Sequence, residues 1–277
     1  EQARAGREAA LGETFSALAD VLERDVYRRI VARRRSATGG ADPLAGRPEI
    51  VCDLHMHTEH SHDCSVSVAD LLAQAEAVGL AAVAITDHNT FAGAREALEL
   101  ARGRSIRVIP GEEIKTTAGE VIGLFLREEI PRGLSMGDTI AAIREQGGVV
   151  YLPHPFDRLH AIPDAQTLHA HLAEIDVFEV YNAKLLREVF NDEALRFARK
   201  YNLTMGAGSD AHVLQAVGTG AVRMRAFETP EEFLIAMRTA EILRRPKSLV
   251  YLQGLKWTAG IRARGRESLA KMTSASS

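Results

Sequence analysis

Short apolar runs alternate with amphipathic stretches along most of the chain. From residue 49 onward, the apolar runs predict buried strands over 50–54, 82–86, 107–109, 121–126, 149–152, 177–181 and 203–207. Ser67 with Asp70 has the pattern of a capping box, and Gly79 stands where that helix would end. Thr229 followed by Pro230 marks the start of another helix. Alternating strands and helices are typical of a parallel sheet covered by helices.

The number of predicted strand–helix units indicates the architecture. Seven units in about 200 residues favour an α/β fold of the β/α (TIM-like) barrel type over an open sheet. The alternative, an open doubly wound sheet, is typically accompanied by a glycine-rich dinucleotide loop, which this sequence lacks. We therefore expect a barrel.

Further segments flank the predicted barrel on both sides. Apolar residues at steps of three and four between Gly6 and Arg35 predict an N-terminal helical extension that packs on the barrel or on a partner protomer. Residues 36–43 have the composition of a linker. We divide the chain into an N-terminal helix and linker over 1–47, the barrel over 48–228, and a C-terminal helix and basic tail over 229–277.

Charge and cysteine content exclude several classes of protein. The 277 residues include 34 Lys and Arg against 37 Asp and Glu, for a net charge of −3, so no global excess indicates a nucleic-acid partner. Two cysteines, Cys52 and Cys64, are too few for a disulfide framework. No apolar run approaches a membrane span, and the N-terminus lacks a signal-peptide pattern, so we expect a cytoplasmic location.

The tail departs from this balance of charge. From Arg244 onward eight basic residues accompany one acidic residue, Glu267, with Leu252, Leu255 and Trp257 among them. This composition is compatible with a weak contact to an anionic surface such as a membrane or nucleic acid. A solvated end or a packing segment is the simpler interpretation, and the oligomeric state stays open.

The predicted strand ends carry the residues most capable of chemistry. His55 and His57 follow the first strand, and Asp210 and His212 follow the last. Members of each pair are two residues apart, so both side chains leave an extended backbone on one face. Intervening strand ends add Asp87, His88, Glu112, Glu113, His154 and Asn182. Because the carboxyl ends of barrel strands share one face, and these are N and O ligands that suit zinc, manganese or iron, the pattern predicts a metal centre.

The motifs at 53–58, 85–90, 109–114, 152–155 and 208–212, together with Asp63, resemble the successive motifs of the PHP family, named for polymerase and histidinol phosphatase. The resemblance implies a distorted seven-stranded β/α barrel, two or three divalent metal ions and the hydrolysis of phosphoesters. The chain departs from the family pattern in two places. Many members have a histidine near the position of Ile122, and a ligand where this chain has Asn182.

The resemblance also implies a ligand set. One ion would be held by His55, His57, Glu113 and Asp210, a second by Glu113 and His154, and a third by Asp63, His88 and His212. From the residues alone the choice between Glu112 and Glu113 stays open, because adjacent strand residues face opposite ways.

This ligand set predicts a metal-dependent phosphoesterase that hydrolyses a phosphate ester of a small molecule or nucleotide with metal-activated hydroxide. Arg158 is the first candidate to bind the phosphoryl oxygens, Lys184 is the second, and Asn182 is a further candidate for substrate binding. His154 or His212 would protonate the leaving oxygen, and loss of the Asp210 carboxylate should abolish activity.

Two other functions compete with this prediction. An amidohydrolase-type enzyme also begins with His-x-His, but it usually has a lysine at the mid-barrel strand end where this chain has Glu113. A non-catalytic metal-binding PHP module is the other alternative, and the near-complete ligand set argues against it.

Overall fold

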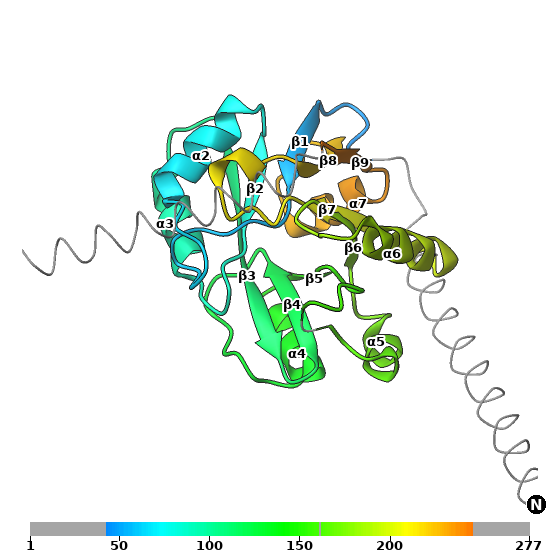
Figure 1. The fold of residues 1–277 in the computed structure, drawn as a ribbon. Coiled ribbons are helices and arrows are strands. Elements are labelled where there is room, and N and C mark those ends of the chain that lie inside the picture. The colour runs from blue at the N-terminus through cyan, green and yellow to red at the C-terminus, as the bar shows by residue number, and fades with distance from the viewer. Residues whose placement is uncertain (1–42, 161, 246–277) are drawn as a thin grey trace, which may run out of the picture.

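The computed structural model describes residues 43–160 and 162–245, and Figure 1 shows their arrangement. In these ranges the strands form one nine-stranded sheet in the order β7-β6-β5-β4-β3-β2-β1-β8-β9. The strands are β1 (Glu49–Asp53), β2 (Ala82–Ile85), β3 (Arg107–Thr116), β4 (Gly119–Leu124), β5 (Val149–Leu152), β6 (Val177–Asn182), β7 (Met205–Gly208), β8 (Gly220–Arg225) and β9 (Glu241–Arg244). The seven predicted strands are confirmed. Their ends lie within two residues of the prediction, except that β3 extends seven residues further than predicted.

Helices cover the outside of the sheet (Figure 1). They are α2 (Val68–Ala77), α3 (Ala92–Leu100), α4 (Met136–Glu145), α5 (Ala165–His171), α6 (Glu188–Lys200) and α7 (Pro230–Met237), with a 3-10 turn, η1 (Leu214–Ala216). The helices α2 and α3 lie side by side on one flank, α4 packs on β4 and β5, and α6 packs on β6. The prediction of an α/β barrel-like fold is thus confirmed.

The predicted helix caps are present. The hydroxyl of Ser67 accepts a hydrogen bond from the backbone N–H of Asp70 at 3.1 Å, which begins α2. Gly79 follows α2 with φ of 78°, a left-handed conformation that glycine adopts without steric cost. Thr229 caps α7, with Pro230 as its first helical residue. Local signals therefore fix these helix ends.

The expectation of an all-parallel sheet is wrong. The pairs β1·β2, β2·β3, β5·β6 and β6·β7 are parallel, whereas β3·β4, β4·β5, β1·β8 and β8·β9 are antiparallel. The physical reason lies in the connection between β3 and β4. Only residues 117 and 118 separate these strands, and so short a loop can join only antiparallel neighbours.

β3 is also longer than the apolar run that predicted it. Its first part, up to Pro110, pairs with β2, and from Gly111 onward it pairs with β4. The apolar pattern stops at Ile109 because Glu112 and Glu113 follow, yet both carboxylates are buried. Because these charged residues interrupt the apolar pattern, the second half of β3 was not predicted from the sequence.

The strands β8 and β9 had no counterpart in the sequence-based prediction. They extend the sheet beyond β1, and α7 and β9 pack against β8. The predicted domain boundary at residues 228 and 229 therefore falls between β8 and α7, within a continuous packed structure.

The sheet curves so that the end of β1 meets the end of β7. Met56 forms a parallel bridge with Ala211, and the backbone N–H of Asp210 donates to the carbonyl of His55 at 2.7 Å. Gly208 makes this approach possible, because a Cβ at that position would lie 2.2 Å from the Cβ of His55. The closure places the residues after β1 directly beside those after β7.

Side chains alternate between two hydrophobic clusters along each strand. In β2, Ala82 and Ala84 belong to the cluster inside the barrel, while Val83 and Ile85 pack in the cluster under the helices. Phe227 and Phe233 contribute to the inner cluster, with their rings 5.2 Å apart. Apolar side chains therefore line both faces of the sheet, and the predicted ligands other than Glu113 follow the strand ends.

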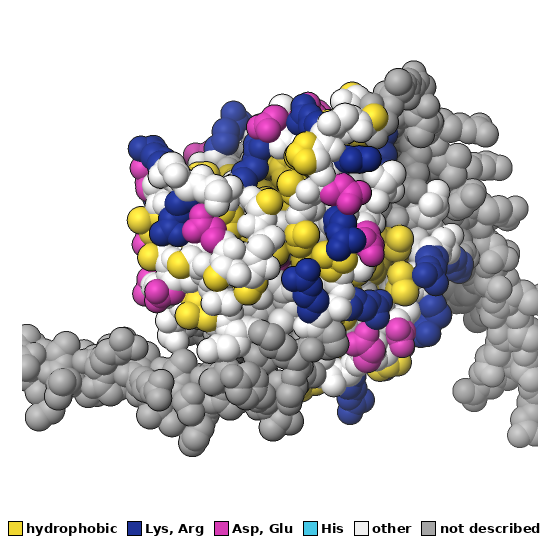
Figure 2. Space-filling view, turned by 90° about the horizontal axis from the view of Figure 1, so that it is seen from above, with side chains coloured by type: hydrophobic (Ala, Val, Ile, Leu, Met, Phe, Trp, Pro, Cys, Tyr) yellow, Lys and Arg dark blue, Asp and Glu magenta, His cyan; other side chains and the backbone are white. Residues whose placement is uncertain are grey.

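The predicted N-terminal helix and nearly all of the basic tail lie outside the described residues. On the face of the molecule in Figure 2, basic and acidic side chains are interspersed with apolar ones. Within the described ranges the longest helix is α6, with 13 residues, and no helix there has the length and apolarity needed to cross a membrane.

Candidate metal centre

The predicted ligands converge at one end of the barrel. His55 and His57 follow β1, His88 follows β2, Glu113 lies in β3, His154 follows β5, and Asp210 and His212 follow β7. All of them except His88 are less than 5% exposed, and Asp63 and His88 lie at the more accessible edge. Buried histidines and carboxylates at this density require partners, since isolated charges are costly away from water.

Glu113 is at the centre of the cluster. Its Oε1 lies 3.0 Å from Nε2 of His154, and its Oε2 lies 3.0 Å from Nδ1 of His88. The same Oε2 is 3.4 Å from Nε2 of His57 and 3.5 Å from Nε2 of His55. Four imidazoles from three separate strand ends thus surround one carboxylate, as expected of a ligand that bridges two ions.

His55 and His57 direct their Nε2 atoms toward each other at 3.2 Å. Oδ1 of Asp210 lies 3.3 Å from Nε2 of His57 and 3.9 Å from Nε2 of His55. Two Nε2 atoms at this distance share at most one proton between them, so at least one of them presents a lone pair. This arrangement suits a cation held between the two rings.

Asp63, His88 and His212 form the outer edge. Nε2 of His212 lies 3.0 Å from Oδ2 of Asp63, and Nε2 of His88 lies 3.7 Å from its Oδ1. The ring nitrogens of His57, His88 and His212 lie within 4.8 Å of one another. The three residues that the family resemblance assigns to a third ion are therefore neighbours.

Glu179, in β6, orients the cluster from behind and was missed by sequence reasoning. It accepts hydrogen bonds from the Tyr151 hydroxyl at 2.8 Å and the His154 backbone N–H at 2.7 Å, and its Oε1 lies 3.2 Å from Nδ1 of His55. A carboxylate on Nδ1 leaves Nε2 of the same ring available to a metal. The signal in the sequence was a lone acidic residue within the apolar run 177–181.

Asp87 has a comparable supporting role on the other side. Its carboxylate accepts from the hydroxyls of Thr58 at 2.7 Å and Ser61 at 2.6 Å, and Oγ of Ser61 lies 3.2 Å from Nδ1 of His57. Asp87 was predicted at a strand end together with His88, yet it supports the loop of the first motif and does not face the ligands directly.

The electrostatic environment keeps two carboxylates of the cluster ionised and one of its imidazoles neutral. Burial raises the pKa of Glu113, but the charge of His55 and hydrogen bonds from neighbouring histidines outweigh it, so the pKa lies well below its usual value. For Asp210, the charges of Lys184 and His55 likewise outweigh burial and lower the pKa. Burial and the charge of His212 lower the pKa of His57, which keeps its imidazole neutral. Ionised carboxylates and a neutral imidazole are the forms that bind metal.

Two of the candidate ligands have left-handed backbone. His154, after β5, has φ of 26°, and Asp210, after β7, has φ of 50°. Residues other than glycine seldom adopt this conformation, and it recurs where a side chain must be directed into a functional site.

The residues present fit divalent metal ions. The side chains of His55, His57 and Glu113 can each place a ligand atom within 4.8 Å of the others, as can those of His55, His154 and Asp210. Among the described residues, Oε2 of Glu113 is surrounded by imidazole nitrogens alone, and Nδ1 of His154 is buried and forms no hydrogen bond. Buried polar atoms are nearly always satisfied, so the donor set and these atoms together indicate bound cations.

The structure distinguishes the two glutamates that sequence reasoning left open. Glu113 faces the cluster, whereas Glu112 faces away and accepts a hydrogen bond from the Ile130 backbone N–H at 2.9 Å. Burial raises the pKa of Glu112 to about 8. The inference from the family motif that Glu113 faces the metals agrees with this geometry.

The strand after the glutamate motif holds a second acidic residue that was not predicted. Ile122, at the expected place of the family histidine, lies in the hydrophobic core. Glu120, two residues earlier, has its Oε2 3.9 Å from Nε2 of His154. Burial and the charge of Glu113 raise its pKa.

The predicted substrate-binding residues differ in position. Nζ of Lys184 lies 3.0 Å from Oδ1 of Asp210 and 3.5 Å from Nε2 of His212. Asn182 donates from Nδ2 to Glu179 and Asp210 at 3.1 and 3.2 Å, so it holds Asp210 in place. The side chain of Arg158 is exposed, and its assignment stays a prediction.

His160 lies nearer the cluster than its polar sequence neighbourhood indicates, since its ring is 4.7 Å from that of His154. Its Nδ1 lies 2.6 Å from Oδ2 of the buried Asp157. His160 therefore belongs to the border of the cluster.

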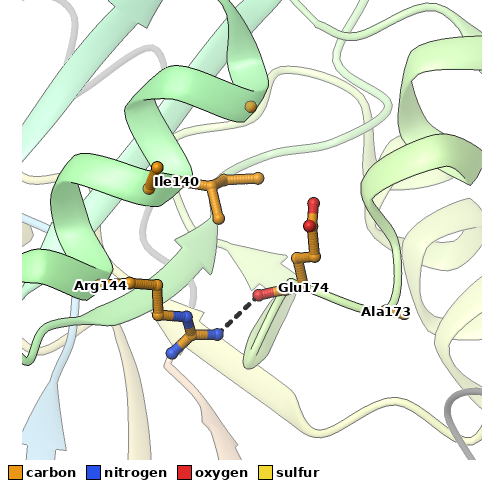
Figure 3. A pocket seen from close by; sticks show the side chains of 6 residues that line it. Ile140, Arg144, Ala173 and Glu174 are labelled. Carbon is orange, nitrogen blue, oxygen red and sulfur yellow. Dashed lines mark hydrogen bonds between the residues drawn. The ribbon is translucent and has the colours of Figure 1, made fainter.

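A separate pocket of about 380 Å³ lies between α4 and the segment after α5 (Figure 3). It is lined by Gly137, Ile140, Ala141, Arg144, Ala173 and Glu174. Arg144 pairs with Asp176 at 2.5 Å and donates to the carbonyl of Glu174 at 2.8 Å. None of the predicted ligands lines this pocket, so the pocket is distinct from the metal centre. The guanidinium of Arg144 already has partners in Asp176 and Glu174.

Comparisons with known proteins agree with this geometry. A family model described as PHP-associated matches residues 189–242. The uncharacterized protein MJ0417 of Methanocaldococcus jannaschii is 35% identical over 211 residues, which are 72% of this chain and 84% of that protein. A 5'-3' exoribonuclease of Haemophilus influenzae is 30% identical over 133 residues, 44% of this chain and 48% of that protein.

A solved structure has the same fold. The lesion-specific endonuclease PfuEndoQ of Pyrococcus furiosus superposes with a TM-score of 0.54 at 16% identity, covering 70% of this chain and 58% of that one. Together with the ligands at successive strand ends and the similarity to sequence relatives, this shows that the chain belongs to the PHP family.

Proposed function

We propose that this chain is a metal-dependent phosphoesterase that hydrolyses a phosphate ester of a small molecule or nucleotide. The observation that carries the proposal is the convergence of histidine nitrogens on Glu113, with Asp210 opposite. When bound, clustered divalent ions supply a nucleophilic hydroxide near neutral pH and neutralise charge on phosphoryl oxygens. An amidohydrolase usually needs a mid-barrel lysine, and Glu113 stands in its place.

Lys184 contacts a candidate ligand, Asp210, at 3.0 Å and is the better placed of the two predicted phosphate binders. Its side chain is 21% exposed, and its ammonium group lies between Asp210 and His212. Burial lowers the pKa of Lys184, but the charge of Asp210 outweighs this and raises it, so the group stays charged. From this position it can orient a phosphoryl oxygen at the edge of the cluster.

Arg158 and His154 complete the proposed machinery. Arg158, in the exposed loop after β5, would contact the part of the substrate that projects from the site. His154 lies 3.0 Å from Glu113 and would hold an ion, and His212, with its Nε2 3.0 Å from Asp63, would help to hold the outer ion.

A nucleic acid is the second candidate substrate. The observation that favours it is the similarity to a relative named as a 5'-3' exoribonuclease. Removal of nucleotides from an RNA end and hydrolysis of a nucleotide phosphate both act on a phosphate ester, so the same residues would serve either substrate.

The test is a substrate screen with metal-free protein reloaded with manganese, zinc or iron. The panel contains nucleotides with 5' or 3' phosphates, small phosphomonoesters and diesters, and short oligoribonucleotides, with free phosphate and product mass as readouts. We expect metal-dependent hydrolysis of at least one nucleotide or small ester. A sample that binds metal but hydrolyses nothing in the panel would contradict the proposal, and cleavage confined to oligoribonucleotides would favour the second candidate.

A further inference from the structure

The antiparallel hairpin of β3 and β4 places a second glutamate on the face of the metal centre. In its register Glu113 is opposite Ile122, and Lys115 is opposite Glu120. Directly opposite residues share a face of the sheet, and so do residues two apart along one strand. Glu120 therefore lies on the same face as Glu113, one step further along the hairpin.

The side chain of Glu120 is directed at the cluster. Its Oε2 lies 3.9 Å from Nε2 of His154, and ligand atoms of His88, Glu113 and Glu120 lie within 4.8 Å of one another. The side chain is 14% exposed, yet Oε2 is buried and forms no hydrogen bond among the described residues. Lys115, its partner across the hairpin, is exposed to solvent.

The arrangement brings two carboxylates close together, and among the described residues only that of Glu113 has imidazole nitrogens within 3.5 Å. Oε2 of Glu113 faces Nδ1 of His88 at 3.0 Å, whereas Oε2 of Glu120 is buried and forms no hydrogen bond in the described structure. Burying one such oxygen is unfavourable, and placing two side by side adds electrostatic repulsion. A cation between the two carboxylates would satisfy the buried oxygen of Glu120 and offset the repulsion between them.

We propose that Glu120 is a metal ligand that completes the site of Glu113 and His154, in place of the histidine that Ile122 replaces. This inference rests on the proposed metal-dependent function. With two carboxylates and one imidazole, the site is richer in oxygen than one built on two imidazoles. Oxygen-rich sites suit manganese, whereas imidazoles suit zinc. Glu120 should therefore raise the affinity of this site for manganese relative to zinc.

The experiment compares Glu120→Gln with the matched control Glu112→Gln. Both substitutions replace a carboxyl group on the same hairpin with an amide of nearly the same size, but Glu112 faces away from the cluster. Metal-free proteins are titrated with manganese by calorimetry, and ions per chain are counted by mass spectrometry after desalting. We expect Glu120→Gln to bind one ion fewer, or to bind that ion at least ~10-fold more weakly, while Glu112→Gln equals the wild type.

A second variant keeps the test decisive if Glu120→Gln does not fold. Glu120→His restores a donor of the other class, so it should keep the ion count and shift the relative affinity from manganese toward zinc. Wild-type stoichiometry and affinity in Glu120→Gln, or an unchanged manganese-to-zinc preference in Glu120→His, would overturn the proposal.

The same samples separate this proposal from the proposed function. If the wild type binds manganese and loses an ion through Glu120→Gln but hydrolyses no ester, the function fails and the ligand assignment stands. If the wild type hydrolyses an ester and Glu120→Gln retains every ion at wild-type affinity, the ligand assignment fails and the function stands.

Discussion

Two neighbouring glutamates occupy opposite regions of this molecule. Glu113 points into the metal centre, where histidines surround it and the pKa lies well below the usual value. Glu112 points to the other side of β3, where one backbone N–H reaches it and burial raises the pKa to about 8. Adjacent positions in the chain therefore hold an ionised candidate ligand, Glu113, and a carboxyl group, Glu112, that is mostly protonated at neutral pH.

The difference shows that residue type alone does not define a site. Both side chains are buried carboxylates in the same strand, with exposures of 1% for Glu113 and 0% for Glu112. What differs is the number of positive or proton-donating groups that converge on each, and only Glu113 faces residues from other strand ends. Substitutions on the two faces should therefore have very different consequences.

The largest expected effect is that of Glu113→Gln. The amide lacks the charge that holds ions among the surrounding histidines, so phosphoesterase activity should fall by on the order of 10³-fold. Initial rates on the best substrate of the screen, with ions per chain counted in parallel, check this. Glu112→Gln is the control, and equal losses in the two variants would contradict the distinction between the faces.

Next in size is Glu179→Gln, which changes a residue that supports the cluster without facing the ions. The amide weakens the interaction that orients His55, so metal affinity should fall by about 10- to 100-fold. Calorimetric titration with manganese measures it. An affinity equal to that of the wild type would show that His55 needs no such partner.

A smaller effect is expected for Lys184→Gln. Loss of the ammonium beside Asp210 removes a charged hydrogen bond to the phosphoryl group, and KM should rise by about 10-fold. Arg158→Gln is the matched comparison, because its side chain is exposed, and we expect a smaller rise in KM. A larger effect at Arg158 would restore the order that the sequence suggested.

The smallest effect on activity is expected for Glu112→Gln, whose consequence is on stability. The folded-state pKa of about 8 exceeds the ordinary value of 4.5, so the folded protein retains a proton that the unfolded chain releases. The free energy of unfolding of the wild type should therefore fall as pH rises from about 4.5 to 8, by at most about 1.4 kcal/mol per pH unit from this group. The variant lacks this contribution, so its stability relative to the wild type should increase over that window and level off above it.

Urea unfolding at pH 5, 7 and 9 measures the difference between the two proteins. The same variant should keep its metal content and its rate of hydrolysis. A stability difference that does not grow with pH would show that Glu112 is ionised throughout.

Much of the fold could be predicted from local patterns. The seven apolar runs became β1 to β7, and the caps at Ser67 and Thr229 lie where the sequence indicates. β8 and β9 were not predicted because Arg223, Arg225 and Glu241 interrupt their apolar pattern. The antiparallel β3·β4 pair was not predicted, because the acidic residues Glu112 and Glu113 interrupt the apolar pattern of β3. The prediction therefore ended β3 too early and made the loop before β4 too long.

The sequence by itself determined which residue types stand at the strand ends, because a period of two and a common carboxyl face follow from strand geometry. Hence His55, His57, His154 and Asp210 could be assigned to one site from the order of residues alone. Only the tertiary structure decided which glutamate faces the metals, that Glu179 stands behind His55, and that Glu120 approaches His154. These contacts depend on the register between strands and on the closure of β1 against β7, and both are set by packing between residues distant in the chain.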